Sequence, residues 1–131
     1  MFSVIRDYSS WLHTRWPAGT VEKLPVSGPQ GITNIPEIRI VGDLTGIPLL
    51  KFSSDTGAKA VHAILKERNF KATRNSQSET LDVAIIGGGI SGISAALEAK
   101  KAGLHYRVFE STQLFSTIIN FPKQKPIYTY P

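Results

Sequence analysis

Three glycines and one glutamate stand at the spacing that a dinucleotide-binding turn requires. The glycines are Gly87, Gly89 and Gly92, and Glu110 follows after a second apolar run. The first glycine permits a tight turn out of a strand, the second lets a pyrophosphate approach the backbone, and the third lets a helix pack closely. The helix N-terminus attracts phosphate, and the carboxylate accepts hydrogen bonds from ribose hydroxyls. These residue types predict binding of an ADP-containing cofactor.

The predicted cofactor contacts lie on the glycine turn, on the first helical turn and at the strand-end acid. They are Gly87, Gly88, Gly89, Ile90, Ser91, Gly92 and Glu110. The negative charge of Glu110 disfavours a 2′-phosphate, so FAD, or alternatively NAD, fits this pattern better than NADP. A glycine-rich turn without a ligand is the structural alternative. The agreement of strand, turn, helix, second strand and acid argues against it.

The flanking sequence predicts the strands and the helix that position these residues. Val83–Ile86 is a short apolar run that predicts a central parallel strand covered on both faces. A helix is expected from near Ile90, with Gly103 ending it, and Tyr106–Phe109 is expected to form the second strand. The fold class predicted is α/β: a partial Rossmann-like, three-layer fold with a short parallel sheet and an N-terminal amphipathic helix.

A second motif lies upstream of the glycine turn. Ile38–Val41 predicts a strand that ends at Gly42-Asp43, and a helix is expected from about Pro48 to Lys66. Its predicted inward stripe is Leu49, Leu50, Ala58, Val61, His62 and Leu65. Gly57 interrupts this helix, at a cost of about 1 kcal/mol relative to alanine. Close packing against a cofactor or another backbone would explain that glycine.

With both motifs in view, the chain resembles the thioredoxin-reductase-like, FAD-dependent pyridine-nucleotide–disulfide oxidoreductases. The matching residues are Gly42 and Asp43 upstream, and the glycine turn with Glu110 downstream. The resemblance implies that the Asp43 carboxylate binds the ribityl chain of the flavin and that the next helix points its amino end at the flavin. It adds Gly42 and Asp43 to the predicted cofactor contacts.

The chain departs from that family in three respects. The Gly-Asp motif precedes the glycine turn instead of following it, cysteine is absent, and no second GxGxxG is present. We therefore expect the FAD-binding portion of a larger, pyridine-nucleotide-linked oxidoreductase, a truncated relic, or a fusion of rearranged pieces. The remaining part of the flavoprotein or a homo-oligomer partner would complete it. The alternatives are an NAD-binding Rossmann module and a non-catalytic interaction fragment that uses the N-terminal Trp-containing helix.

Length, composition and charge exclude several classes of function. The 131 residues allow one domain of modest size, and the absence of cysteine excludes a thiol nucleophile. The net charge of +5 is scattered along the chain, which favours a solvated surface over a nucleic-acid platform. The three histidines show no metal spacing, so neither catalytic residues nor metal ligands are predicted. No apolar run is long enough for a membrane span. A cytoplasmic location is expected, with which the absence of cysteine agrees.

The predicted organisation has four parts. Residues 1–31 form an N-terminal helix and turn region, and residues 32–68 carry the strand, Gly-Asp and helix of the upstream motif. Residues 69–80 form a polar linker, and residues 81–131 hold the βαβ fingerprint and a tail. We expect residues 32–131 to form one domain. The N-terminal helix would gather Phe2, Ile5, Trp11, Leu12 and Trp16 on one side.

Overall fold

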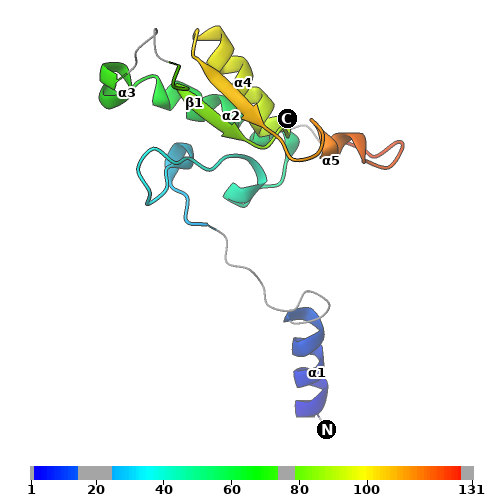
Figure 1. Ribbon diagram of the computed structural model, residues 1–131. Coiled ribbons are helices and arrows are strands. Elements are labelled where there is room, and N and C mark those ends of the chain that lie inside the picture. Colours follow the sequence, from blue (N-terminus) through cyan, green and yellow to red (C-terminus); the bar gives the residue numbers. More distant parts are fainter. Residues whose placement is uncertain (1, 15–24, 74–78, 128–131) are drawn as a thin grey trace.

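A computed structural model describes residues 2–14, 25–73 and 79–127 of the chain (Figure 1). In chain order the elements are α1 (Phe2–Thr14), the 3-10 turns η1 (Pro29–Gly31) and η2 (Gly42–Thr45), α2 (Leu50–Ile64), α3 (Arg68–Thr73), β1 (Val83–Ile86), α4 (Ile90–Lys101), β2 (Tyr106–Phe109) and α5 (Ser116–Ile119). Among the described residues, no helix has the length and apolar character that a membrane crossing needs.

The centre of the fold is the β1-α4-β2 unit. The two strands pair in parallel, with Val83 opposite Tyr106 and Ile86 opposite Phe109. Parallel strands need a crossover connection, and α4 supplies it. Gly103 has a φ of +64°, the left-handed conformation that commonly ends a helix. The predicted strand, helix and strand are therefore confirmed, as is the role of Gly103.

The hydrophobic core lies between this sheet and the helices α4 and α2. It consists of Val61 of α2, Ile85 of β1, Ala95, Ala96 and Ala99 of α4, and Leu104. Alternate residues of a strand face opposite sides of a sheet, so Val83 and Ile85 point together toward this core. The small alanine side chains let α4 lie close to the strands, as the sequence predicts.

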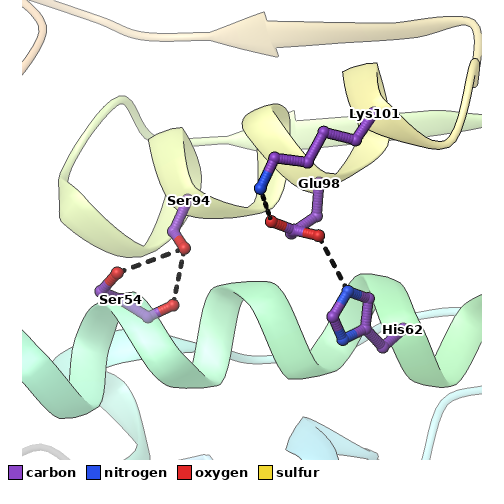
Figure 2. A network of polar contacts seen from close by, with 5 residues as sticks. All are labelled: Ser54, His62, Ser94, Glu98 and Lys101. Carbon is purple, nitrogen blue, oxygen red and sulfur yellow. Dashed lines mark hydrogen bonds and ion pairs between the residues drawn. The ribbon is translucent and has the colours of Figure 1, made fainter.

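The opposite face of the sheet is open. Ile86 is 82% exposed and its partner Phe109 is 43% exposed, because no described helix covers this side. Instead α2 lies along α4, on the side already covered (Figure 2). The predicted covering of both strand faces, and with it the three-layer arrangement, is therefore wrong for the described residues. They form a mixed helix-and-strand unit with a two-stranded parallel sheet.

The predicted strand Ile38–Val41 is also wrong. This segment makes one isolated antiparallel bridge, between Arg39 and Ile32, and does not join the sheet. Glu37 has a φ of +68°, which turns the chain immediately before the segment. The Thr33 hydroxyl donates to the carbonyl oxygen of Ile38 at 2.9 Å. Local side-chain contacts thus occupy backbone groups that a sheet ladder would need.

Helix α2 falls inside the predicted range but differs from it in detail. It begins at Leu50, so Pro48 precedes the N-cap residue Leu49 and does not occupy the first helical turn. Val61 is buried as predicted, whereas His62 and Leu49 are exposed. The inward stripe was therefore predicted only in part, because the small residues Ser53, Ala60 and Ala63 also face inward.

The glycine within α2 has a packing reason. A Cβ added at Gly57 would lie only 2.1 Å from the backbone oxygen of Ser91 in α4. Any side chain at this position would push the two helices apart. The expectation that Gly57 packs against another backbone is confirmed, and the close approach brings α2 to the first turn of α4.

The predicted linker, residues 69–80, begins as helix. Helix α3 extends to Thr73, and Phe70 packs against the hydrophobic core. Helix thus occupies residues 69–73 of the predicted linker, and the domain boundaries stay a prediction. Residues 74–78 lie outside the described residues, so that part of the prediction is not tested.

Helix α1 confirms the predicted N-terminal helix over Phe2–Thr14. Val4, Ile5, Tyr8 and Trp11 are exposed apolar side chains, and the Tyr8 and Trp11 rings stack with centroids 5.9 Å apart. Figure 1 shows α1 apart from the β1-α4-β2 unit. Trp16, which the sequence placed on the same apolar side, lies outside the described residues.

Candidate functional site

The turn from β1 into α4 has the geometry that its glycines predict. Gly87 has a φ of +99°, which is a conformation that side chains other than glycine rarely adopt. A Cβ added at Gly92 would lie 2.0 Å from the carbonyl oxygen of Gly87. The start of α4 therefore packs directly against the turn, and a side chain at either position would change the path of the chain.

The N-terminus of α4 is open to an anion. Gly89 is its N-cap residue, no side chain caps the helix, and its first turn carries no acidic residue. The first N–H groups of a helix, here those of Ile90, Ser91 and Gly92, have no intrahelical acceptor. A Cβ added at Gly89 would meet nothing within 4 Å. Protein packing thus leaves free the space where the sequence predicts a pyrophosphate.

Glu110 lies directly after β2 and faces the glycine turn. Its Oε2 accepts the backbone N–H of Gly88 at 2.5 Å, and its Oε1 accepts the backbone N–H of Thr112 at 3.0 Å. The Gly88 N–H, and after it the Thr112 N–H, lower the pKa of Glu110 from 4.5 to about 2. The carboxylate is therefore ionised throughout the neutral range and can accept hydrogen bonds from ligand hydroxyls.

The segment after Glu110 makes contacts with the turn that were not predicted. The backbone N–H of Phe115 donates to the carbonyl oxygen of Gly88 at 2.9 Å. The side chain of Leu114 lies so close to Gly88 that an added Cβ would fall 2.4 Å from it. These contacts depend on the path of a loop, and neither residue type signals them in the sequence.

An open cleft lies at the carboxyl ends of the two strands. Its volume is about 600 Å³ and its lining residues are Ile86, Gly87, Val108, Phe109, Glu110 and Ser111. Ligands of open α/β sheets bind at this end of the strands, and the volume falls within the range typical of small-molecule sites. The cleft combines an apolar wall with one ionised carboxylate.

The upstream motif reaches the same end of α4. A Cβ added at Gly42 would lie 2.5 Å from the side-chain oxygen of Ser91. The sequence predicted Gly42 near Gly87 and Gly89. The structure brings it against the first turn of α4, without the sheet strand that was expected to carry it there. The two motifs are thus adjacent, but η2 and α2, and not a strand of the sheet, bring Gly42 to α4.

Hydroxyl groups of α2 hold the Gly42-Asp43 turn. Ser53 donates to Oδ1 of Asp43 at 2.6 Å, and the Gly42 N–H donates to the Thr56 side-chain oxygen at 2.9 Å. Sequence reasoning missed Ser53 and Thr56, although two hydroxyls one helical turn apart in the expected helix were the available signal. Asp43 is exposed, and its contact with a flavin stays a prediction.

Polar contacts along their length fix α2 against α4 (Figure 2). The Ser94 hydroxyl donates to the backbone oxygen of Ser54 at 2.7 Å. Farther along, His62 contacts Glu98 at 2.8 Å and Lys101 donates to the same carboxylate at 2.7 Å. Lys101, and after it His62, lower the pKa of Glu98. These contacts hold the two helices side by side, and both run in the same direction (Figure 2).

The donor set fits a dinucleotide. Uncapped N–H groups at the start of α4 suit a pyrophosphate, and the ionised Glu110 suits the adjacent ribose hydroxyls. The open space at Gly89 leaves room for the phosphates between them. The residues present therefore match the two chemical groups that every ADP-containing cofactor carries.

Comparison with known proteins agrees with this geometry. Residues 82–121 match a family described as an FAD binding domain. A protein named as a bifunctional amine oxidase in Dictyostelium discoideum is 32% identical over 94 residues. That match covers 72% of this chain but 9% of the amine oxidase, so the chain spans a small part of the length of this relative. No solved structure matches the chain.

The matched segment contains the glycine turn, α4, β2 and Glu110. Between the two cofactors that the sequence left open, the comparison selects FAD over NAD. FAD is therefore the cofactor of the segment 82–121.

Proposed function

We propose that this chain is the FAD-binding portion of a flavin-dependent oxidoreductase. The observation that carries the proposal is the ionised Glu110 beside the uncapped N-terminus of α4, inside the segment that matches an FAD binding domain. The bound flavin would supply the redox chemistry, while the residues described here bind and orient it.

Each part of the cofactor has an expected partner. The N–H groups of Ile90, Ser91 and Gly92 hold the pyrophosphate, and Glu110 accepts the adenosine ribose hydroxyls. Asp43, one residue from the contact between Gly42 and α4, binds the ribityl chain. The position of the upstream motif beside the first turn of α4 supports this last assignment.

The direct test compares the wild type with Gly89→Val. A valine at this position meets no protein atom within 4 Å of its Cβ, so the fold should persist, but the side chain fills the space expected for the phosphates. After incubation with FAD and gel filtration, the wild type should retain visible flavin absorption and the variant should lose it. Retention of FAD by a folded Gly89→Val protein, judged by circular dichroism, would refute the proposed site.

The electron donor has two candidates. Identity of 32% to a protein named as an amine oxidase favours an amine. The resemblance of the Gly42-Asp43 motif to pyridine-nucleotide-linked reductases favours a nicotinamide, although the sequence holds no second GxGxxG. Anaerobic mixing of the flavin-loaded protein with a primary amine, NADH or NADPH distinguishes them, because reduction bleaches the visible flavin absorption.

The open sheet face supports a further element of the proposal, that additional polypeptide completes the fold. Parallel sheets are normally covered on both faces, yet Ile86 and Phe109 remain exposed. The rest of a larger flavoprotein, or a second copy of this chain, would bury them. Sedimentation velocity separates these two partners, since only the second copy makes the purified chain dimeric.

A further inference from the structure

Gly88 is held on both sides by the segment that follows β2. Its N–H donates to Glu110 at 2.5 Å, and its carbonyl oxygen accepts the N–H of Phe115 at 2.9 Å. The second carboxylate oxygen of Glu110 accepts the N–H of Thr112 at 3.0 Å, which fixes the orientation of the carboxylate itself. The N–H and the carbonyl oxygen of Gly88 are thus both bound by the loop that follows β2.

This restraint falls where the chain has the most conformational freedom. Gly87, Gly88 and Gly89 are consecutive, and glycine loses more backbone entropy on ordering than any other residue. The turn leads directly into Ile90, the first residue of α4. Fixing Gly88 therefore fixes the direction in which the first N–H groups of the helix point.

We propose that Glu110 is a positioning residue for the pyrophosphate-binding turn, acting through the N–H of Gly88, in addition to its ribose contact. The proposal rests on the proposed function, because it concerns the same cofactor site. It assigns to Glu110 an effect on a part of the ligand that its carboxylate does not touch.

Electrostatics alone predicts the opposite sign. An ionised carboxylate near a pyrophosphate repels it, so removal of that charge should strengthen anion binding. If Glu110 positions the turn, removal of its hydrogen bond should weaken anion binding instead. The two effects can be separated, because charge and reach can be changed independently at this residue.

The experiment uses the full chain and inorganic pyrophosphate, which carries no ribose. Glu110→Asp keeps the charge but is one methylene shorter, so its contact with Gly88 is lost. Glu110→Gln loses the charge but keeps one acceptor oxygen for the Gly88 N–H, while its NH2 group takes the place of Oε1, beside the Ser111 and Thr112 hydroxyls that can accept from it. We expect the aspartate variant to lose about fivefold in pyrophosphate affinity, as for a lost hydrogen bond, and the glutamine variant to bind at least as tightly as the wild type. NMR titration measures both.

A second readout follows the turn without any ligand. Exchange of the Gly88 amide hydrogen should accelerate in Glu110→Asp and stay slow in Glu110→Gln. Glu37→Gln is the matched charge control, because Glu37 is exposed and does not line the cleft. It should leave both the affinity and the exchange rate unchanged.

Two results would overturn the proposal. The first is wild-type affinity and slow Gly88 exchange in Glu110→Asp, with tighter binding in Glu110→Gln, which would mean that Glu110 acts on the anion through its charge alone. The second is failure of the wild type to bind either pyrophosphate or FAD, which would overturn the proposed function as well. Binding of FAD by the wild type distinguishes the two cases.

Discussion

The βαβ region, Val83–Phe109, and the upstream region, Ile32–Ile64, meet at the first turn of α4 but are stabilised differently. The first has a parallel strand ladder and an alanine-lined helix packed on one sheet face. The second has one isolated bridge and a set of hydroxyl-to-backbone contacts around η2 and α2. Both regions place backbone against backbone where they touch, at Gly57 and Ser91.

This difference indicates a division of roles. The βαβ region carries the groups that contact an ADP moiety, and they are fixed by the strands and the helix themselves. The upstream region depends on α4 for its position, since Gly42 and Gly57 both pack against Ser91 and polar side chains join α2 to α4 farther along. Changes in the upstream region should therefore affect stability and the flavin half of the cofactor more than the ADP half.

The largest expected effect is on stability and concerns Gly57→Ala. An alanine in a helix is normally more stable than a glycine by about 1 kcal/mol. Here the new Cβ would fall 2.1 Å from the Ser91 carbonyl, so we expect a net loss of about 1–3 kcal/mol from overpacking. Urea denaturation measures it. Gly28→Ala is the control, since its Cβ would meet no atom closer than 3.6 Å. If Gly57→Ala were more stable than the wild type, the close packing of the two regions at Gly57 and Ser91 would be contradicted.

The next effect concerns the preference of the ADP site. Glu110→Arg removes the ribose acceptor and introduces a cation, so ADP affinity should fall about tenfold to a hundredfold. Adenosine 2′,5′-bisphosphate should lose less, because its 2′-phosphate can pair with the arginine. Calorimetry with both nucleotides measures the ratio, and Glu79→Arg controls for the change in net charge. An unaltered ratio would leave Glu110 without a role in ribose recognition.

A smaller effect should distinguish the role of the Gly42-Asp43 motif from that of the glycine turn. Asp43→Asn removes a charged partner of the ribityl chain, so FAD affinity should fall about fivefold while ADP affinity stays constant. Fluorescence titration with FAD and calorimetry with ADP measure the two values. Asp55→Asn, in the Asp55–Lys59 pair of the neighbouring helix α2, is the matched control. Equal loss for both ligands would mean that Asp43 acts on the fold and not on the flavin.

The smallest expected effect is the pH dependence of the Glu110 contact. The N–H groups of Gly88 and Thr112 lower the pKa of this carboxyl from 4.5 to about 2. A lowered carboxyl pKa stabilises the folded state above pH 4.5, and this contribution is lost as the pH falls toward 2. The urea midpoint of the wild type should exceed that of Glu110→Gln at pH 7, and the difference should shrink below pH 4.5. A constant difference would contradict the assigned cause.

The fingerprint could be predicted because its signals are local. A β-branched run, a positive-φ glycine and a helix of small residues each determine their own element, and Val83–Ile86, Ile90–Lys101 and Tyr106–Phe109 follow. The contact of Phe115 with the turn and that of Thr112 with Glu110 could not be predicted, since they depend on how a loop folds back. Backbone groups make them, and these are the same for every residue type other than proline.

The upstream strand failed for a related reason. The sequence Ile38–Val41 is compatible with a strand, but a strand also needs a partner, and Glu37 and Thr33 direct the chain into a local loop instead. The open sheet face could not be predicted either, because an apolar run such as Val83–Ile86 has the same composition whether one or both of its faces are covered.

The central claim is that the chain binds FAD through its ADP half at the glycine turn. Competition measures this most directly: FAD bound to the wild-type chain is challenged with ADP or with FMN, and its release is followed by flavin fluorescence. We predict that ADP displaces FAD, and that FMN at the same concentration leaves it bound. Displacement by FMN but not by ADP would contradict the assignment of the Gly89 and Glu110 site to the ADP moiety.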